Sequence, residues 1–316
     1  MRIFHRVLHG LFKLVAKPQL SMLIYHQVVE SRDAMRPDEP TAAEFEWQMA
    51  LVSQYFTPMS LSDAKKALAN DSLPKDAICV TFDDGYVNNL TVAQPILEKY
   101  DVPATVYVAT GFCDGDNMFN DRIIDLIGDD KRSSVNLESL DMGIVTLESI
   151  EQRITLYSNV IKQIKYLTYP ERKATIDKLY KANDCAEYPS RMMTPSQIKA
   201  LSDTGVTIGA HTVDHPILRT LTEAEQRKQI SDSKTMLENL VGKVVCHFAY
   251  PNGKLGDDYS SETRNIVEEQ GFETAVSTHN GVSNKETDIF QLKRFTPWDK
   301  SPLKFHLRLL LTALKG

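Results

Sequence analysis

Short apolar runs rich in β-branched residues alternate with helical patterns along most of the chain. Runs of this kind predict strands, and apolar residues at helical spacing between them predict helices. Strand-then-helix repetition is typical of a parallel sheet or a β/α barrel. The predicted strands are Met22–Tyr25, Ile78–Phe82, Ala104–Val108, Val206–Ala210, Val244–Ala249, Thr274–Ser277 and Gln291–Phe295. The predicted helices include Ala43–Tyr55, Leu61–Ala69, Val92–Tyr100, Pro195–Thr204, Glu223–Leu240 and Ser260–Gln270.

One stretch, at about residues 119–191, interrupts this alternation. Its pattern is mostly helical, and it contains no convincing strand. We interpret it as an insertion between consecutive β/α units of one domain that spans residues 20–316. A lid, a substrate-recognition element and an oligomer contact are the roles that such an insertion suggests.

Residues 1–19 have a different pattern, in which basic and apolar residues are interleaved at helical spacing. A signal peptide would place its charge first, then an uninterrupted apolar stretch and small residues at a cleavage site. Here the charges run throughout, so export by this route is disfavoured and a cytoplasmic location is expected. The pattern predicts either a helix packed on the domain or a basic amphipathic helix on the inner face of the membrane.

The amino-acid composition argues against two classes of function, nucleic-acid binding and a thiolate zinc site. Among 316 residues, 36 are Lys or Arg and 42 are Asp or Glu, which gives a net charge of −6. A protein that binds nucleic acid usually carries a basic excess, so nucleic acid is not expected as a partner. The four cysteines form no CxxC pair, which argues against a thiolate zinc site.

Two adjacent carboxylates, Asp83 and Asp84, directly follow the predicted strand Ile78–Phe82. Adjacent carboxylates beside a buried strand are costly unless a cation lies near them. At the carboxyl end of a parallel strand they would face the usual location of catalysis. A plain Asp-Asp-Gly turn is the alternative interpretation.

Two histidines, His211 and His215, follow the predicted strand Val206–Ala210. Histidines at this spacing can converge on one ion, although such pairs also arise by chance. With Asp84 they make a set of two histidines and one carboxylate. This set suits Zn²⁺ and also Fe²⁺, Co²⁺ or Mn²⁺, and we prefer Lewis-acid hydrolysis because no redox motif is evident.

The sequences TFDDGY at 81–86 and HTVDH at 211–215 resemble the first two motifs of the polysaccharide deacetylases, the NodB-homology or carbohydrate esterase family 4 group. Residues 248–253 resemble the third motif. The resemblance implies a distorted (β/α)7-type barrel with a helical insertion. It implies a divalent metal, most often Zn²⁺, with Co²⁺, Ni²⁺ and Mn²⁺ as alternatives. The implied roles are a general base at Asp83 and metal ligands at Asp84, His211 and His215.

The chain departs from the third motif at two positions. Ala249 stands where the family has an arginine that orients the base, and we expect Arg294 to supply that charge. Asn252 replaces a tyrosine whose backbone N–H helps to hold the oxyanion, and it can keep that function. With Tyr250, it belongs to the predicted substrate-binding residues.

The family's last motif, Leu-x-x-His, provides the general acid and normally lies near the C-terminus. This chain has Leu23-Ile24-Tyr25-His26 on its first predicted strand, so it resembles the circularly permuted branch with His26 as the acid. His279 is the competing candidate, and a histidine with only a structural role is the other alternative. Trp298 and Leu23 are expected to line the pocket that holds the methyl group of the acetyl substituent.

The function that these residues predict is hydrolysis of an N-acetyl group on an amino sugar, within a glycan or a lipid-linked sugar. A metal-dependent O-acetyl esterase or deformylase on the same scaffold is the alternative. A non-catalytic glycan-binding module is a third interpretation, and Ala249 is the feature in its favour.

Overall fold

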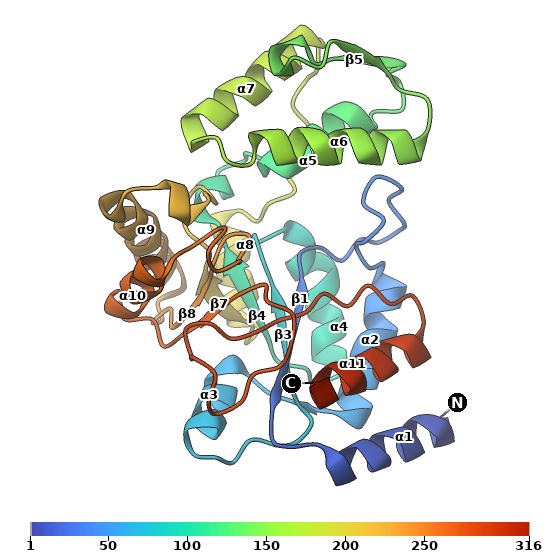
Figure 1. Cartoon of the computed structure of the whole chain (residues 1–316), viewed down its shortest axis with the longest axis vertical. Helices are drawn as coiled ribbons and strands as arrows, with labels where there is room; N and C mark the ends of the chain where they lie inside the picture. Colours follow the sequence, from blue (N-terminus) through green and yellow to red (C-terminus); the bar gives the residue numbers. More distant parts are fainter. Residues whose placement is uncertain (1, 316) are drawn as a thin grey trace.

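A curled, mostly parallel sheet forms the centre of the molecule (Figure 1). The structure, a computed structural model, describes residues 2–315. The strand order is β1-β3-β4-β7-β8-β9, all in parallel pairs, and the short β2 pairs with the start of β3. The bounds are β1 Leu20–Tyr25, β2 Thr57–Pro58, β3 Ala77–Phe82, β4 Ala104–Val108, β7 Thr207–Ala210, β8 His247–Ala249 and β9 Thr274–Val276.

The predicted last strand, residues 291–295, is not a regular strand, and this prediction was wrong in detail. Leu292 forms an isolated bridge with Val276 of β9, and Phe295 forms another with Leu23 of β1. The segment passes from one neighbour to the other within four residues, so it cannot form a ladder with either. It nevertheless donates and accepts backbone hydrogen bonds on both sides and closes the sheet into a distorted barrel.

Helices surround the sheet, and apolar side chains from both fill the core. Several helices begin at a capping box, as at Thr41 and Glu44, where each residue's side chain accepts from the other's backbone N–H. The predicted helices are confirmed apart from their ends. Their bounds are α2 Ala42–Tyr55, α3 Leu61–Ala69, α4 Gln94–Lys99, α8 Pro195–Asp203, α9 Glu223–Val241 and α10 Ser261–Glu269.

The segment between β4 and α8 forms a helical body at one end of the molecule, at the top of Figure 1. Its helices α5, α6 and α7 bury their own apolar cluster. The expectation of no strand was wrong, because β5 and β6 form a small antiparallel hairpin. Each strand has only three residues, which is too short to give an alternating apolar pattern. The bounds are α5 Phe119–Gly128, β5 Ser134–Asn136, β6 Ile144–Thr146, α6 Ile150–Ile164 and α7 Tyr169–Ala182.

Two terminal helices, α1 (Arg2–Val15) and α11 (Pro302–Lys315), pack on each other and on α2. Helix α1 leads directly into the first residue of β1, so it lies at the amino ends of the strands, at the bottom of Figure 1. Its buried side includes His5, His9 and Phe12, while much of its apolar side is exposed. Within the described residues, every helix is too short or too polar to cross a bilayer.

Candidate active site

The carboxyl ends of β3 and β7 bring the two sequence motifs together. Asp83 and Asp84 follow β3, His211 follows β7, and β4 lies between the two strands. Parallel strands end at the same edge of a sheet, so these side chains share one end of the barrel. Gly209 of β7 lies against the Tyr107 ring, which a Cβ at that position would strike.

Asp84, His211 and His215 converge on one point. Their ligand atoms all lie within 4.8 Å of one another, and all three residues are buried. The Nε2 atoms of His211 and His215 each lie 3.5 Å from Oδ1 of Asp84. The backbone of Asp84 and His215 is left-handed, with φ of 72° and 48°. Such conformations are unfavourable for these residues and are usually held by surrounding contacts.

The hydrogen bonding of this set fits a divalent cation. Oδ1 of Asp84 is buried without a hydrogen-bond partner, which is costly for a carboxylate oxygen unless a cation satisfies it. Nδ1 of His211 lies 2.7 Å from the carbonyl oxygen of Ala249. A proton on Nδ1 makes that bond and leaves the Nε2 lone pair free for a metal. Two imidazoles and one carboxylate are donors that Zn²⁺ and related ions accept.

Burial and mutual charge set the ionisation of this set. Burial alone would raise the pKa of Asp84, but His211 and His215 hold it well below its usual range. Burial likewise opposes protonation of His211, whereas the nearby negative charges of Asp84 and Asp83 raise its pKa. Burial lowers the pKa of His215 to about 3, so this imidazole is neutral at pH 7. An anionic Asp84 and a neutral His215 are the forms that bind a metal.

Asp83 is held by Arg294, a fully buried residue of the segment that closes the barrel. The guanidinium donates from Nη1 to Oδ1 of Asp83 over 2.7 Å and from Nη2 to Oδ2 over 2.8 Å. Its Nε donates to the carbonyl oxygen of Ser277. Burial would raise the pKa of Asp83, but the charge of Arg294 outweighs it and lowers this pKa. Asp83 therefore stays ionised beside the metal-ligand set.

His26 follows β1 and lies near the same carboxylates. Positive charge on His26 lowers the pKa of both Asp83 and Asp84, after larger effects from nearer groups. Its half-buried side chain also lowers the pKa of Glu39, which burial raises. His279 is exposed. Tyr25 of β1 pairs with Phe82 of β3, and the backbone N–H of Asp83 donates to the carbonyl oxygen of Tyr25 over 2.9 Å. His26 therefore follows β1 beside Asp83, and this position favours it over His279 as the histidine of this site.

The predicted substrate-contacting residues are more scattered. The side chains of Leu23 and Tyr250 are fully buried, and the Tyr250 hydroxyl donates to the carbonyl oxygen of Phe290. Both expectations for these side chains are corrected, because core packing leaves them no surface for a substrate. Asn252 is half-buried with φ of 59°. Trp298 is 53% exposed beside Arg308.

Sequence patterns missed the residues that link the inserted body to this site. Arg172 of α7 donates to the loop that carries His215, and Asp121 of α5 accepts from the hydroxyl of Tyr86. Tyr86 stands in the TFDDGY motif, which was the available signal for it. Neither Arg172 nor Asp121 has a sequence signal, because each lies among ordinary charged residues of a helix.

A barrel that brings two buried aspartates and two buried histidines together at the carboxyl ends of its strands fits a hydrolytic enzyme. The family profile "Polysaccharide deacetylase" matches residues 70–275, so the chain belongs to the polysaccharide deacetylase family. It is a hydrolase of the deacetylase type.

Individual relatives are distant in sequence. YxkH of Bacillus subtilis (strain 168), whose name places it among the polysaccharide deacetylases, is 22% identical over 277 residues, which cover 87% of this chain and 70% of that protein. The Streptococcus pyogenes deacetylase PplD, solved with acetate, has a TM-score of 0.62 at 20% identity and covers 93% of this chain and 99% of its own. IcaB from Ammonifex degensii has a TM-score of 0.59 at 19% identity, with 95% and 98% covered. These structures share the fold.

Proposed function

We propose that this protein removes N-acetyl groups from an acetylated amino-sugar glycan and uses a divalent cation, for which Zn²⁺ is the first candidate. The observation that carries the proposal is the convergence of Asp84, His211 and His215 beside Asp83, which Arg294 keeps ionised. The acetate in the similarly folded PplD supports this reaction class.

The proposed roles follow from charge and position. A divalent cation bound by Asp84, His211 and His215 would supply Lewis-acid activation of water and of the amide carbonyl. Asp83 accepts the proton of the attacking water, and Arg294 holds the carboxylate in the geometry for this transfer. His26, when protonated, donates to the departing amine, which would otherwise leave as a very basic anion. The backbone N–H of Asn252 helps to hold the oxyanion.

The position of His26 directly after β1 supports assignment to the circularly permuted branch of the family. The acid comes from the first strand, and the segment at 292–295 joins that strand to the last one. In a closed barrel either chain end can supply a group at this place. Trp298 is the remaining candidate for an aromatic wall of the substrate pocket.

The direct test is acetate release from acetylated chitooligosaccharides by protein loaded with Zn²⁺. We expect turnover that a chelator removes and that Zn²⁺ or Co²⁺ restores. Asp83→Asn is the matched control, because it should keep the metal and lose about 10²–10⁴-fold in rate. Cleavage of acetylated esters without any amide cleavage would favour the esterase alternative. Bound metal without turnover on a broad glycan panel would favour a glycan-binding module.

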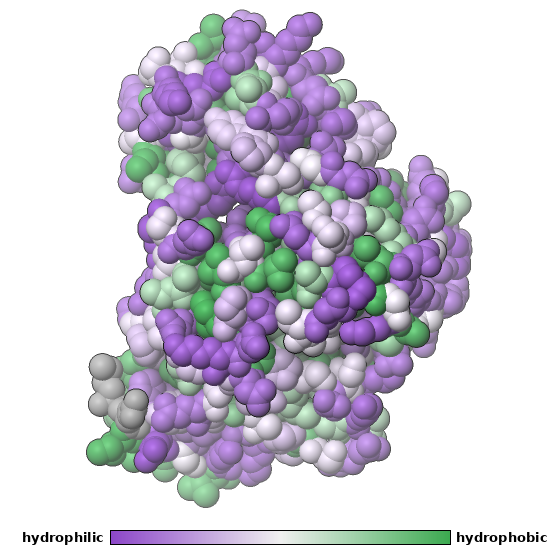
Figure 2. Space-filling view, turned by 180° about the vertical axis from the view of Figure 1, so that it is seen from behind, coloured by the Kyte–Doolittle hydropathy of each residue, from purple (hydrophilic) through white to green (hydrophobic). Residues whose placement is uncertain are grey.

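We also propose that the terminal helices rest on the inner face of an anionic membrane. Seven basic and no acidic residues occur in 1–17 and 302–316 together, although the whole chain is acidic. Large apolar side chains are exposed on the same two helices, and those of α1 gather at the lower left of Figure 2. Free cysteines suit a reducing compartment. The exposed apolar residues are Ile3, Phe4, Val7, Leu11, Leu14 and Val15 of α1 and Leu303, Leu311 and Leu314 of α11.

This orientation bears on the substrate. Helix α1 lies at the amino ends of the strands, whereas the proposed catalytic groups lie at the carboxyl ends. A protein resting on α1 would hold its site away from the lipid headgroups. The arrangement favours a glycan that extends from the surface over a short lipid-linked sugar.

Vesicle flotation tests the membrane proposal with a matched pair of variants. Leu11→Glu should lower binding to vesicles with anionic lipid by about tenfold or more, because it removes an exposed leucine that the membrane would bury and adds repulsion. Ile144→Glu, an equally exposed apolar residue in the inserted body, should leave binding unchanged. Equal flotation of wild type with neutral and anionic vesicles, or none with either, would contradict the proposal. Self-association lost in Leu11→Glu would instead identify a second copy as the occupant.

A further inference from the structure

Arg172 of α7 connects the inserted body to the loop that carries two of the proposed metal ligands. Its Nη2 lies 3.1 Å from the carbonyl oxygen of Asp214 and 3.4 Å from that of His215. The guanidinium also lies over the ring of Phe119, 4.2 Å from its centroid. Arg172 is only 2% exposed, so its charge is directed at these carbonyls and not at solvent.

A carboxylate partner does not explain this burial. Arg172 forms no ion pair with Asp or Glu within 4.0 Å among residues 2–315, unlike Arg36 and Arg122 of the same region. Burying a guanidinium without a counter-charge is costly unless its donors are well used. Here Nη2 donates to the two loop carbonyls, and the guanidinium packs over the ring of Phe119.

The loop that receives these hydrogen bonds needs support. Thr212 and His215 both have left-handed backbone, with φ of 65° and 48°. The ring of His211 is held through Nδ1 by the carbonyl of Ala249, but Nδ1 of His215 has no hydrogen-bond partner. The direction of the His215 side chain therefore depends on its backbone, which is where Arg172 binds.

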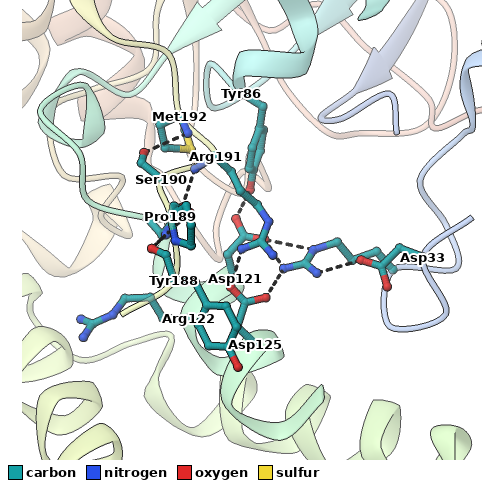
Figure 3. A network of polar contacts seen from close by, with 12 residues as sticks. Asp33, Tyr86, Asp121, Arg122, Asp125, Tyr188, Pro189, Ser190, Arg191 and Met192 are labelled. Carbon is teal, nitrogen blue, oxygen red and sulfur yellow. Dashed lines mark hydrogen bonds and ion pairs between the residues drawn. The ribbon is translucent and has the colours of Figure 1, made fainter. Parts of the chain in front are cut away.

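The other ligand loop has its own link to the inserted body (Figure 3). Tyr86 lies two residues after Asp84, and its hydroxyl donates to Oδ2 of Asp121 over 2.8 Å. Arg36 donates to Asp121 over 2.7 Å and to Asp125 over 3.0 Å. Arg191, on the returning chain, pairs with the other oxygen of Asp125. Helix α5 is thus bound to the loop that follows β3.

We propose that the insertion positions the two ligand loops of the metal site, with Arg172 as the positioning residue for His215. This inference rests on the proposed metal site and adds a role for the insertion that differs from a substrate lid. Residues that orient metal ligands without touching the ion commonly change metal affinity by 10–100-fold when they are mutated. The insertion therefore sets how tightly the cation is held.

The chain offers a matched control for Arg172. Arg153 of α6 is also a buried arginine of the insertion, and it donates to the carbonyl oxygens of Ile127, Asp129 and Arg132. All of these acceptors lie inside the insertion. Arg153→Gln therefore removes a comparable set of hydrogen bonds without touching a ligand loop.

The experiment measures the Zn²⁺ dissociation constant of the full-length protein by competition with a chromophoric chelator. It also records the absorption spectrum of the Co²⁺ form and the Tm of the metal-free form. Arg172→Gln should raise the Zn²⁺ dissociation constant roughly 10–100-fold and shift the Co²⁺ bands. Arg172→Lys should give partial rescue. Arg153→Gln should lower Tm and leave the dissociation constant and the bands unchanged.

Contrary results separate the two proposals. If Arg172→Gln lowers Tm as Arg153→Gln does but binds Zn²⁺ like wild type, Arg172 is only structural and this inference is overturned. A wild type that binds no divalent cation would overturn the metal site itself as well. Should Arg172→Gln not fold, Tyr86→Phe removes one hydroxyl only, and Zn²⁺ affinity equal to that of wild type would count against the positioning of the Asp84 loop.

Discussion

Two buried clusters of histidine and aspartate lie at opposite ends of the central sheet. One is the metal cluster of Asp84, His211 and His215 at the carboxyl ends of the strands. The other, the terminal-helix cluster, combines His5, His9 and His306 with Asp76 between α1, α11 and the start of β3. The residue types are the same and the burial is similar. Composition alone therefore cannot tell a ligand set from a structural one.

Hydrogen-bond partners distinguish the two clusters. In the terminal-helix cluster, Asp76 binds His9 over 3.0 Å, Lys13 over 2.6 Å and the Thr57 hydroxyl over 3.0 Å. The histidines there pair and stack with one another. In the metal cluster, Oδ1 of Asp84 faces two imidazole nitrogens and has no hydrogen-bond partner. A set whose hydrogen bonds are satisfied internally can stabilise the fold, whereas a converging set with an unpaired acceptor fits the proposed cation site.

The largest expected effect is that of Asp84→Asn. We expect the deacetylation rate to fall by about 10⁴-fold, because loss of the cation removes several kcal/mol of transition-state stabilisation. Wild type should gain about 2.7 kcal/mol of stability at a metal concentration 100 times its dissociation constant, and the variant should gain none. Kinetics and thermal unfolding with and without Zn²⁺ measure both quantities.

The stability of the same variant without metal also tests whether the two clusters differ in role. Asparagine tolerates the left-handed backbone at position 84 and carries no buried charge. The metal-free Tm of Asp84→Asn should therefore equal or exceed that of wild type. A clear loss of metal-free stability would mean that Asp84 has a structural role like that of Asp76.

The next largest effect concerns His26. Replacement by alanine should slow amide cleavage by about 10²–10⁴-fold and slow cleavage of an activated ester far less, because an alkoxide leaves without help from an acid. The measurement is kcat on an acetylated chitooligosaccharide and on an activated acetyl ester. His279→Ala serves as the control and should affect neither reaction. Equal losses on both substrates for His26→Ala would contradict its role as the acid.

Local pattern predicted much of the fold and which side chains converge at the carboxyl ends of the strands. Six of the predicted strands and their intervening helices follow from apolar periodicity, which burial in a parallel sheet imposes directly. Asp84 and His211 could be predicted as candidates because each stands just after such a strand, and His215 because it follows His211 at a spacing that lets both rings converge. Arg294 was also predicted as the partner of Asp83, and the guanidinium binds that carboxylate with two hydrogen bonds.

Other features depend on packing between distant segments, which local pattern does not encode. Leu23 and Tyr250 were expected at the substrate, yet tertiary packing places both side chains in the core. Arg172 contacts a loop more than forty residues away, and nothing in its own helix marks it. Helix α1 also reverses the usual amphipathic pattern, in which apolar side chains are buried and polar ones are exposed. It buries His5 and His9 against α11 and exposes apolar residues.

A moderate effect is expected for Asp76→Asn in the terminal-helix cluster. Burial would raise the pKa of Asp76, but His9 and Lys13 lower it to about 2, so the carboxylate is anionic in the folded protein. Its contribution to stability is present above the unfolded pKa near 4 and is lost as pH falls toward 2. The variant should lower the free energy of unfolding by about 1–3 kcal/mol and leave kcat and Zn²⁺ affinity unchanged. Loss of Zn²⁺ affinity would mean that the two clusters are coupled.

The smallest expected effect is the pH dependence of His306. Burial, and then the charges of His5 and His9, lower its pKa to about 3, and its ring also faces Tyr55 and Phe56. Between the unfolded pKa near 6.5 and pH 3 the unfolded chain binds the extra proton, so this histidine makes stability fall as pH falls. As pH falls below 6.5, this histidine should therefore cost wild type up to about 1.4 kcal/mol of stability per pH unit. The His306→Gln variant, measured like wild type in the presence of a chelator, should not show this loss. Denaturant unfolding from pH 8 to 5 measures this, and parallel curves for the two proteins would show that the cluster does not titrate on unfolding.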